Sequence, residues 1–126
     1  MFKHCFEGGR ERYFATGRKK AGEMNKTEEA YGERLEAMRR AGFVHSWKYE
    51  SVTFKLAKDC RYTPDFYVLN ADGVPEFHEV KGSPFVFQDD AKVKIKVAAE
   101  QHPEFRFFVC WPRKKQDGGG WEIKEM

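Results

Sequence analysis

The sequence lacks any apolar run that approaches the roughly 20 residues of a membrane-spanning helix. Its first residues also lack the apolar stretch of a secretory signal. The three cysteines, Cys5, Cys60 and Cys110, lie far apart and form no CxxC pair, so neither a disulfide framework nor a zinc cluster is indicated. These absences predict a soluble, cytoplasmic protein without a membrane partner.

The composition is that of a packed domain with clustered positive charge. Apolar residues make up 40% of the 126 residues and aromatic residues 16%, which predicts one domain with an aromatic-rich core. The net charge is only +3, but basic residues crowd three segments, at residues 10–20, 92–96 and 113–115. Such clusters suit a polyanion, because each phosphate contact releases condensed counterions. Solvated surface is the alternative explanation.

The N-terminal part of the chain differs from the rest. Residues 1–24 combine glycines and basic residues without a sustained apolar period, so we expect a flexible basic arm there. Residues 25–126 are expected to form the single domain. A helix is predicted over residues 27–41, because apolar residues recur at helical spacing and Gly42 supplies a stop.

The remaining sequence alternates between strand-like and helix-like patterns. Three β-rich stretches come first, at residues 43–54, 62–69 and 76–81. A second helix is predicted over about residues 89–101, followed by an apolar strand at residues 105–111 and a last short strand at residues 121–124. This order predicts an α/β fold with an αβββαβ core, in which helices flank a central mixed sheet.

The residues that carry chemistry lie on the second and third expected strands. Asp65 follows Pro64 on the second strand, and Glu79 and Lys81 end the third. Side chains alternate faces along a strand, so Glu79 and Lys81 point the same way. Adjacent strands joined by a turn then bring Asp65 beside Glu79, which places two carboxylates and an ammonium on one face.

This set of groups suits phosphodiester hydrolysis with a hard cation. Mg²⁺ prefers oxygen ligands, keeps several waters and commonly takes one or two carboxylates. The predicted metal ligands are Asp65, Glu79 and the backbone carbonyl of Val80, with Mn²⁺ expected to substitute for Mg²⁺. Lys81 is predicted to orient or help deprotonate a water and to stabilise transition-state charge. The alternative is a solvated strand face with an ordinary salt bridge.

A further carboxylate is expected from the first helix. Glu28 lies three residues before Tyr31 and seven before Leu35, so it shares the inward stripe, whereas Glu29 falls on another face. We therefore predict Glu28 as a catalytic and metal-binding residue. The competing explanation is a capping box, in which Glu28 only bonds back to the amide of Asn25.

Three short stretches carry a family resemblance: Asn25-Lys26-Thr27-Glu28, Tyr62-Thr63-Pro64-Asp65-Phe66 and Phe77-His78-Glu79-Val80-Lys81-Gly82. They resemble the PD-(D/E)XK nuclease superfamily, and within it the small phage and prophage endonucleases of the Holliday-junction resolvase type, over about residues 25–110. The resemblance implies a restriction-endonuclease-like core and DNA cleavage that depends on Mg²⁺ or Mn²⁺. It also implies acidic metal ligands, a lysine that supports the nucleophile, and a bacterial or phage-infected host cell.

The expected partner is DNA. The sequence shows no separate sequence-reading domain, which favours branched DNA over restriction-type specificity, and symmetric junction cleavage favours a homodimer. The predicted DNA-binding residues are Arg18, Lys19, Lys20, Lys26, Lys94 and Lys96. Two alternatives stay open: a non-catalytic DNA-binding accessory protein on the same fold, and a repair or restriction-type nuclease.

Overall fold

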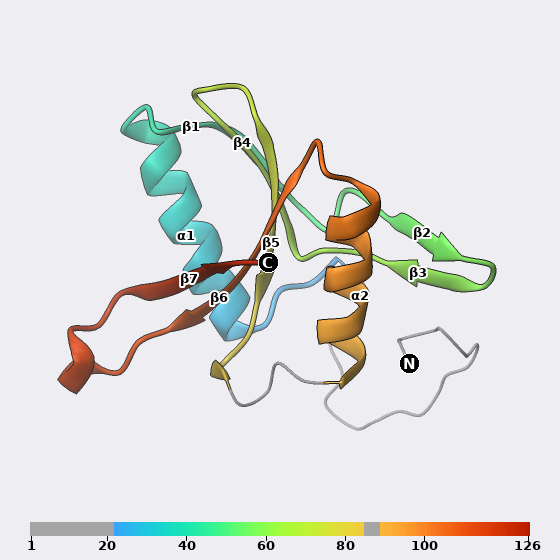
Figure 1. The fold of residues 1–126 in the computed structure, drawn as a ribbon. Helices are drawn as coiled ribbons and strands as arrows, with labels where there is room; N and C mark the ends of the chain where they lie inside the picture. The colour runs from blue at the N-terminus through green and yellow to red at the C-terminus, as the bar shows by residue number, and fades with distance from the viewer. Residues whose placement is uncertain (1–21, 85–88) are drawn as a thin grey trace.

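The computed structural model describes residues 22–84 and 89–126. These residues form a mixed α/β fold with two helices, a five-stranded sheet and a separate two-stranded sheet (Figure 1). In chain order the elements are α1 (Lys26–Arg40), β1 (Val44–Tyr49), β2 (Phe54–Ala57), β3 (Cys60–Tyr62), β4 (Phe66–Asn70), β5 (Pro75–Val80), α2 (Asp89–Gln101), β6 (Arg106–Pro112), η2 (Lys115–Asp117) and β7 (Trp121–Glu125). No helix in the two described ranges is long and apolar enough to cross a membrane.

The larger sheet has the strand order β1-β4-β5-β6-β7. Its β5–β6 pair is parallel and the other neighbours are antiparallel. A parallel pair needs a crossover connection, because the chain must return to the start of the next strand. The segment that contains α2 makes this crossover between β5 and β6.

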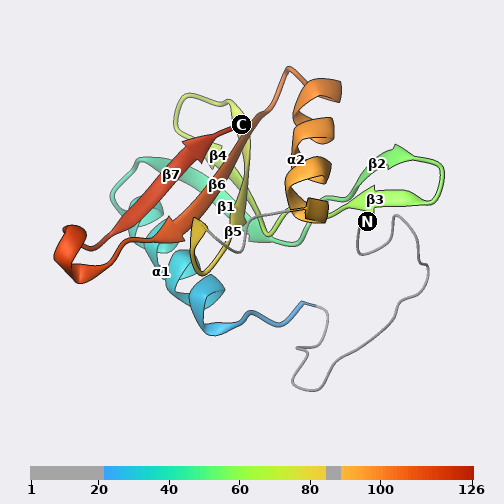
Figure 2. The same cartoon turned by 60° about the horizontal axis from the view of Figure 1, so that its bottom comes forward.

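Two apolar clusters fill the opposite faces of this sheet. The cluster under α1 contains Tyr31, Leu35, Val44, Phe66, Val68, Val80 and Cys110. The cluster under α2 contains Phe54, Tyr62, Phe77, Ile95, Ala98, Phe107 and Val109. Because strand side chains alternate, β5 sends Val80 toward α1 and both Phe77 and Glu79 toward α2. Figures 1 and 2 show the two helices apart from each other, with the strands between them.

The three β-rich stretches expected at residues 43–54, 62–69 and 76–81 supply the antiparallel neighbours β1, β4 and β5, but two of the expected bounds are wrong. Residues 43–54 do not form one strand, because the chain turns at Glu50, whose φ is 47°, before the β2–β3 hairpin begins. Residues 62–69 are likewise divided between β3 and β4, with Pro64 in the break. Proline has no N–H to donate to a sheet. The stretch at residues 76–81 corresponds to β5 almost unchanged.

The helices and the last two strands match the sequence predictions closely. In α1 the side chain of Asn25 caps the first turn, and Gly42 follows the last turn at a φ of 90°. The last short strand expected at residues 121–124 is present as β7, antiparallel to β6. The expected N-terminal arm lies outside the described residues, except for residues 22–24.

Candidate active site

The candidate active site lies where β4 and β5 separate. Their antiparallel pairing ends at Phe66 and His78. Asp65 comes next, and its Oδ2 accepts a 2.8 Å hydrogen bond from the backbone N–H of Val80. In an extended strand the N–H and C=O of one residue point to the same neighbour, so the Val80 carbonyl also faces this gap.

Glu79 and Lys81 lie beside Asp65 and point the same way. Lys81 Nζ is 3.2 Å from Glu79 Oε2. The other carboxylate oxygen, Oε1, accepts a 2.8 Å hydrogen bond from the hydroxyl of Tyr62 on β3. The Glu79 side chain is 9% exposed and that of Lys81 is 23% exposed, so the lysine is the more accessible of the two. Tyr62 and Lys81 together hold the Glu79 carboxylate in one orientation.

Glu28 forms the helix cap, and its charge also acts on Asp65 and Lys81 in the candidate active site. Its Oε1 accepts a 3.0 Å hydrogen bond from the Asn25 N–H, and its own N–H donates to Asn25 Oδ1 at 2.8 Å, which completes a capping box. The Tyr49 hydroxyl donates to the same Oε1 at 2.8 Å. Glu28 is 5% exposed, whereas Glu29 is exposed. The cap and the inward orientation therefore coexist in one side chain.

The acidic groups of the site influence one another strongly. Burial raises the pKa of Asp65 well above its usual range, the charges of Glu79 and Glu28 add to this rise, and the Val80 N–H opposes it. Burial alone would lower the pKa of Lys81, but the carboxylates of Glu79, Asp65 and Glu28 raise it above its ordinary value. Lys81 therefore remains protonated at neutral pH, which suits a hydrogen-bond donor and a positive charge instead of a base.

The donor set fits a divalent cation that keeps most of its waters. Among residues 22–84 and 89–126, no three His, Cys, Asp or Glu side chains converge as a ready-made metal site. The site brings together two carboxylates, Asp65 and Glu79, and the inward carbonyl of Val80. This set is typical of Mg²⁺, which commonly takes one or two protein carboxylates. Burial is the main cause of the raised pKa of Asp65, and the charges of Glu79 and Glu28 add to it; a cation at the site would offset those charges.

The predicted DNA-contact residues are placed differently from one another. Arg18, Lys19 and Lys20 lie outside the described residues. Lys26 is exposed at the start of α1, and Lys96 is exposed on α2. Lys94 is 4% exposed, because helical spacing places it with Ile95 and Ala98 on the inward face of α2. Of the two predicted α2 contacts, only Lys96 is therefore open to a phosphate.

A buried polar network that the sequence analysis missed lies on the α1 face of β5. The Tyr31 hydroxyl is 2.6 Å from His78 Nδ1, and His78 Nε2 is 2.9 Å from Glu76 Oε1. Asn70 Nδ2 donates to Glu76 Oε2, and Arg106 Nη1 lies 3.7 Å from that oxygen. A carboxylate only accepts hydrogen bonds, so His78 carries its proton on Nε2 and its Nδ1 accepts from Tyr31.

Three of the network residues are almost fully buried. The exposed fractions are 0% for Tyr31, 5% for His78 and 6% for Glu76. Burial also raises the pKa of the neighbouring Cys110 thiol to about 12. A sequence signal for the network existed. Glu76 and His78 are polar residues that share one face of a strand predicted to lie in a central sheet flanked by helices, where both faces are buried. The network ties α1 to the strand that carries Glu79.

Comparison with known proteins adds nothing to this geometry. No protein-family model, curated protein or solved structure matches the chain.

The raised pKa of Asp65 predicts how stability depends on pH. The folded protein retains a proton on Asp65 at pH values where the unfolded chain has lost it, so stability falls as pH rises from the ordinary aspartate pKa to the folded one. Asp65→Asn removes this charge but keeps an acceptor for the Val80 N–H. The variant is expected to be more stable than the parent at pH 7, without metal, and the difference should shrink toward pH 3.

Urea unfolding at a series of pH values measures this difference. Asp59→Asn makes the same chemical change at an exposed turn residue and is the matched control. A variant that is less stable than the parent at pH 7 would contradict the prediction, because the Asp65 charge would then be a net contributor to stability.

Proposed function

We propose that the protein is a metal-dependent DNA endonuclease that hydrolyses phosphodiester bonds. The observation that carries this proposal is the convergence of Asp65, Glu79 and Lys81 where β4 and β5 separate. Burial and the charge of Glu79 raise the pKa of Asp65 there, and Lys81 Nζ lies 3.2 Å from Glu79 Oε2. Groups of this kind are needed to hold a hard cation against a phosphate.

The arrangement of elements supports a restriction-endonuclease-like core. α1, β1, β4, β5, α2 and β6 follow the order αβββαβ. The β2–β3 hairpin is then an insertion between the first two core strands, and β7 extends the sheet at its edge. Asp65 immediately precedes β4, and Glu79 and Lys81 lie at the C-terminal end of β5. The resemblance to PD-(D/E)XK nucleases implies a site built from these residues.

Each residue of the site has a distinct role in the proposed reaction. Asp65, Glu79 and the Val80 carbonyl would hold Mg²⁺ or Mn²⁺, and Glu28 on α1, whose charge raises the pKa of Asp65, is the candidate for a further ligand. When bound, the cation supplies Lewis acidity toward the phosphate and lowers the pKa of a bound water. The water oxygen would bond to phosphorus as the bond to the leaving deoxyribose oxygen breaks; the water gives up one proton to solvent, and the leaving oxygen takes one from solvent. Lys81 orients the water and places positive charge beside the phosphate oxygens in the transition state.

Structure-selective cleavage of branched DNA is the favoured form of this activity. The test is cleavage of a labelled four-way junction and a matched linear duplex. With Mg²⁺ we expect symmetric paired nicks in the junction, and with EDTA we expect none. A single cut in the linear duplex would instead favour a repair or restriction-type nuclease. Sedimentation of the protein with the junction tests the proposed homodimer, which supplies two active sites to a symmetric substrate.

A non-catalytic DNA-binding protein is the second candidate. Tyr62 and Lys81 satisfy both oxygens of Glu79 without any cation, which is what a structural ion pair requires. This candidate predicts that the junction is bound with equal affinity in Mg²⁺ and EDTA and is never cut. Cleavage that requires Mg²⁺ would exclude it.

A further inference from the structure

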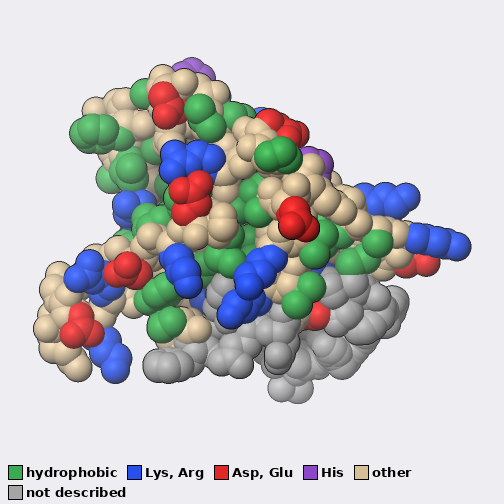
Figure 3. Space-filling view, in the orientation of Figure 1, with side chains coloured by type: hydrophobic (Ala, Val, Ile, Leu, Met, Phe, Trp, Pro, Cys, Tyr) green, Lys and Arg blue, Asp and Glu red, His purple; other side chains and the backbone are tan. Residues whose placement is uncertain are grey.

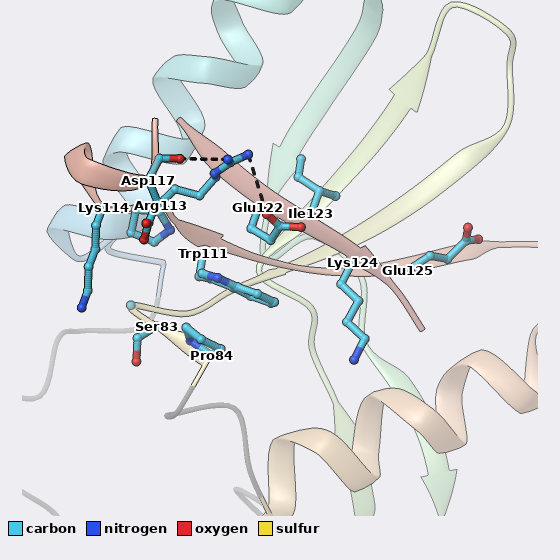
Figure 4. A pocket seen from close by; sticks show the side chains of 12 residues that line it. Ser83, Pro84, Trp111, Arg113, Lys114, Asp117, Glu122, Ile123, Lys124 and Glu125 are labelled. Carbon is cyan, nitrogen blue, oxygen red and sulfur yellow. Dashed lines mark hydrogen bonds and ion pairs between the residues drawn. The ribbon is translucent and has the colours of Figure 1, made fainter. Parts of the chain in front are cut away.

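An open groove lies beside the candidate active site. It has a volume of about 1070 Å³ and runs between the segment after β5 and the β6–β7 hairpin (Figure 4). Gly82, Ser83 and Pro84 line one side of it and directly follow Lys81 in the chain. A strand of DNA with its phosphate at Lys81 therefore has a path into this groove.

Trp111 supplies an aromatic surface in the groove. It lies on the same face of β6 as Phe107 and Val109 and packs partly against their cluster. Figure 4 shows its indole between Ser83 and Pro84 on one side and β7 on the other. Its exposure is intermediate, so part of the ring remains open to the groove. An indole in this position offers a stacking surface for a nucleobase.

The charged side chains around Trp111 leave positive charge available. Arg113 Nη1 lies 3.8 Å from Glu122 Oε1, and Arg106 forms two hydrogen bonds to Glu125, so two of the acidic side chains are paired. The ammonium groups of Lys114 and Lys124 form no ion pair within residues 22–84 and 89–126. Figure 4 shows them on opposite sides of the indole.

The lining is not uniformly basic. Asp117 also lines the groove, and Figure 3 shows basic and acidic side chains interspersed over the β6–β7 hairpin. Two unpaired ammonium groups and one further carboxylate suit a ligand whose charges are spaced along its length. A duplex suits this mixed lining less well, because its two strands together carry one negative charge per about 1.7 Å of axis, against about 3.4 Å for one strand. A single strand has phosphates at intervals and bases that are free to stack.

We propose that this groove binds an unpaired DNA strand next to the scissile phosphate. One base stacks on Trp111, and flanking phosphates contact Lys114 and Lys124. The proposal rests on the nuclease function and narrows its substrate class. Duplex bases are already stacked on one another, so the site selects strands that are single or splayed apart, as at a branch.

The experiment measures binding of a labelled single-stranded oligonucleotide and a duplex of the same sequence, in Ca²⁺ so that cleavage is suppressed. Trp111→Ala is expected to weaken single-strand binding roughly tenfold or more, and Trp111→Phe to retain most of the affinity. Lys114→Ala and Lys124→Ala should each reduce the slope of log affinity against log salt by about 0.7. Lys115→Ala, an exposed neighbour outside the groove lining, is the matched control. Thermal unfolding confirms that each variant is folded.

The outcomes separate this proposal from the proposed function. Unchanged affinity in Trp111→Ala, unchanged salt dependence in both lysine variants, or no single-strand binding by the parent would each overturn the groove proposal. A parallel assay with Mg²⁺ records cleavage by the parent. If the parent cleaves DNA but the groove variants bind the single strand as well as the parent does, the nuclease proposal holds and the groove proposal is wrong. If the groove variants bind the single strand more weakly but the parent never cleaves DNA, the groove is a DNA-binding site and the proposed nuclease activity is wrong.

Discussion

Lys81→Ala is expected to lower the rate of DNA cleavage by roughly 10²- to 10³-fold, the usual loss when one preorganised stabilising donor is removed. Asp65→Asn is expected to lower the cleavage rate by at least the same factor, because it removes a charged ligand from the cation. Neither variant should lose its fold. Lys81 is partly exposed, and the amide oxygen introduced by Asp65→Asn still accepts the Val80 N–H. The measurement is the single-turnover rate on a saturating four-way junction in Mg²⁺.

The design of this experiment separates chemistry from binding. Lys55→Ala removes an exposed lysine of β2 and controls for a general loss of positive charge. Junction affinity in Ca²⁺ should fall less than the rate in both active-site variants. If Lys81→Ala cleaves as fast as the parent, Lys81 is part of a structural ion pair with Glu79 and the proposed catalytic role is wrong.

The role of Glu28 can be resolved in the same assay. Glu28→Gln keeps an acceptor for the Asn25 amide and for the Tyr49 hydroxyl, so the cap geometry survives without the charge. A rate close to that of the parent would assign Glu28 to the cap alone. A loss comparable to that of Asp65→Asn would make it part of the metal site.

The second large effect is expected on stability, at the buried network of Tyr31, His78 and Glu76. His78→Ala leaves the Tyr31 hydroxyl and the Glu76 carboxylate without their shared partner in a nearly dry site. Each buried hydrogen-bonding group left unsatisfied costs about 1–3 kcal/mol, and more when the group is charged, so His78→Ala should cost about 3–5 kcal/mol in total. Tyr31→Phe removes the donor to His78 Nδ1 and the acceptor of the longer contacts from Arg34 and Cys110, which costs about 1–3 kcal/mol. Urea unfolding at pH 7 measures both losses.

Controls make this prediction specific to the network. His45→Ala removes an exposed histidine from β1 and should change the free energy of unfolding little. In a double-mutant cycle, the variant with both Tyr31→Phe and His78→Ala should lose less free energy of unfolding than the two single variants lose together, because both changes break the same hydrogen bond. Additive losses, or a His78→Ala variant as stable as the parent, would show that the network contributes no coupling.

The central residues of the candidate site followed from local pattern. A strand alternates its side chains, so the spacing of Glu79 and Lys81 was enough to place them on one face. The turn that follows β4 makes β4 and β5 neighbours, which brings Asp65 to the end of the same pair. The capping box around Glu28 is also local, because its two partners are three residues apart.

The partners of these residues could not be predicted in the same way. Tyr62 reaches Glu79 across 17 positions of sequence, and Tyr49 reaches Glu28 across 21. Tyr62 does so from a hairpin that the strand pattern did not reveal, because the apolar alternation continues through Pro64. Only the spatial position of that hairpin decides which carboxylate the hydroxyl meets.

The sequence by itself determined the helices, the end of β5 and the acidic and basic groups that it presents, because periodicity and capping act over a few residues. The tertiary structure alone decided the burial that raises the pKa of Asp65, the pairing of His78 with Tyr31 and the position of Trp111 beside the segment after Lys81. These features depend on which distant segments exclude water from a group. Desolvation and hydrogen bonding are properties of the packed neighbours, and no local spacing specifies them.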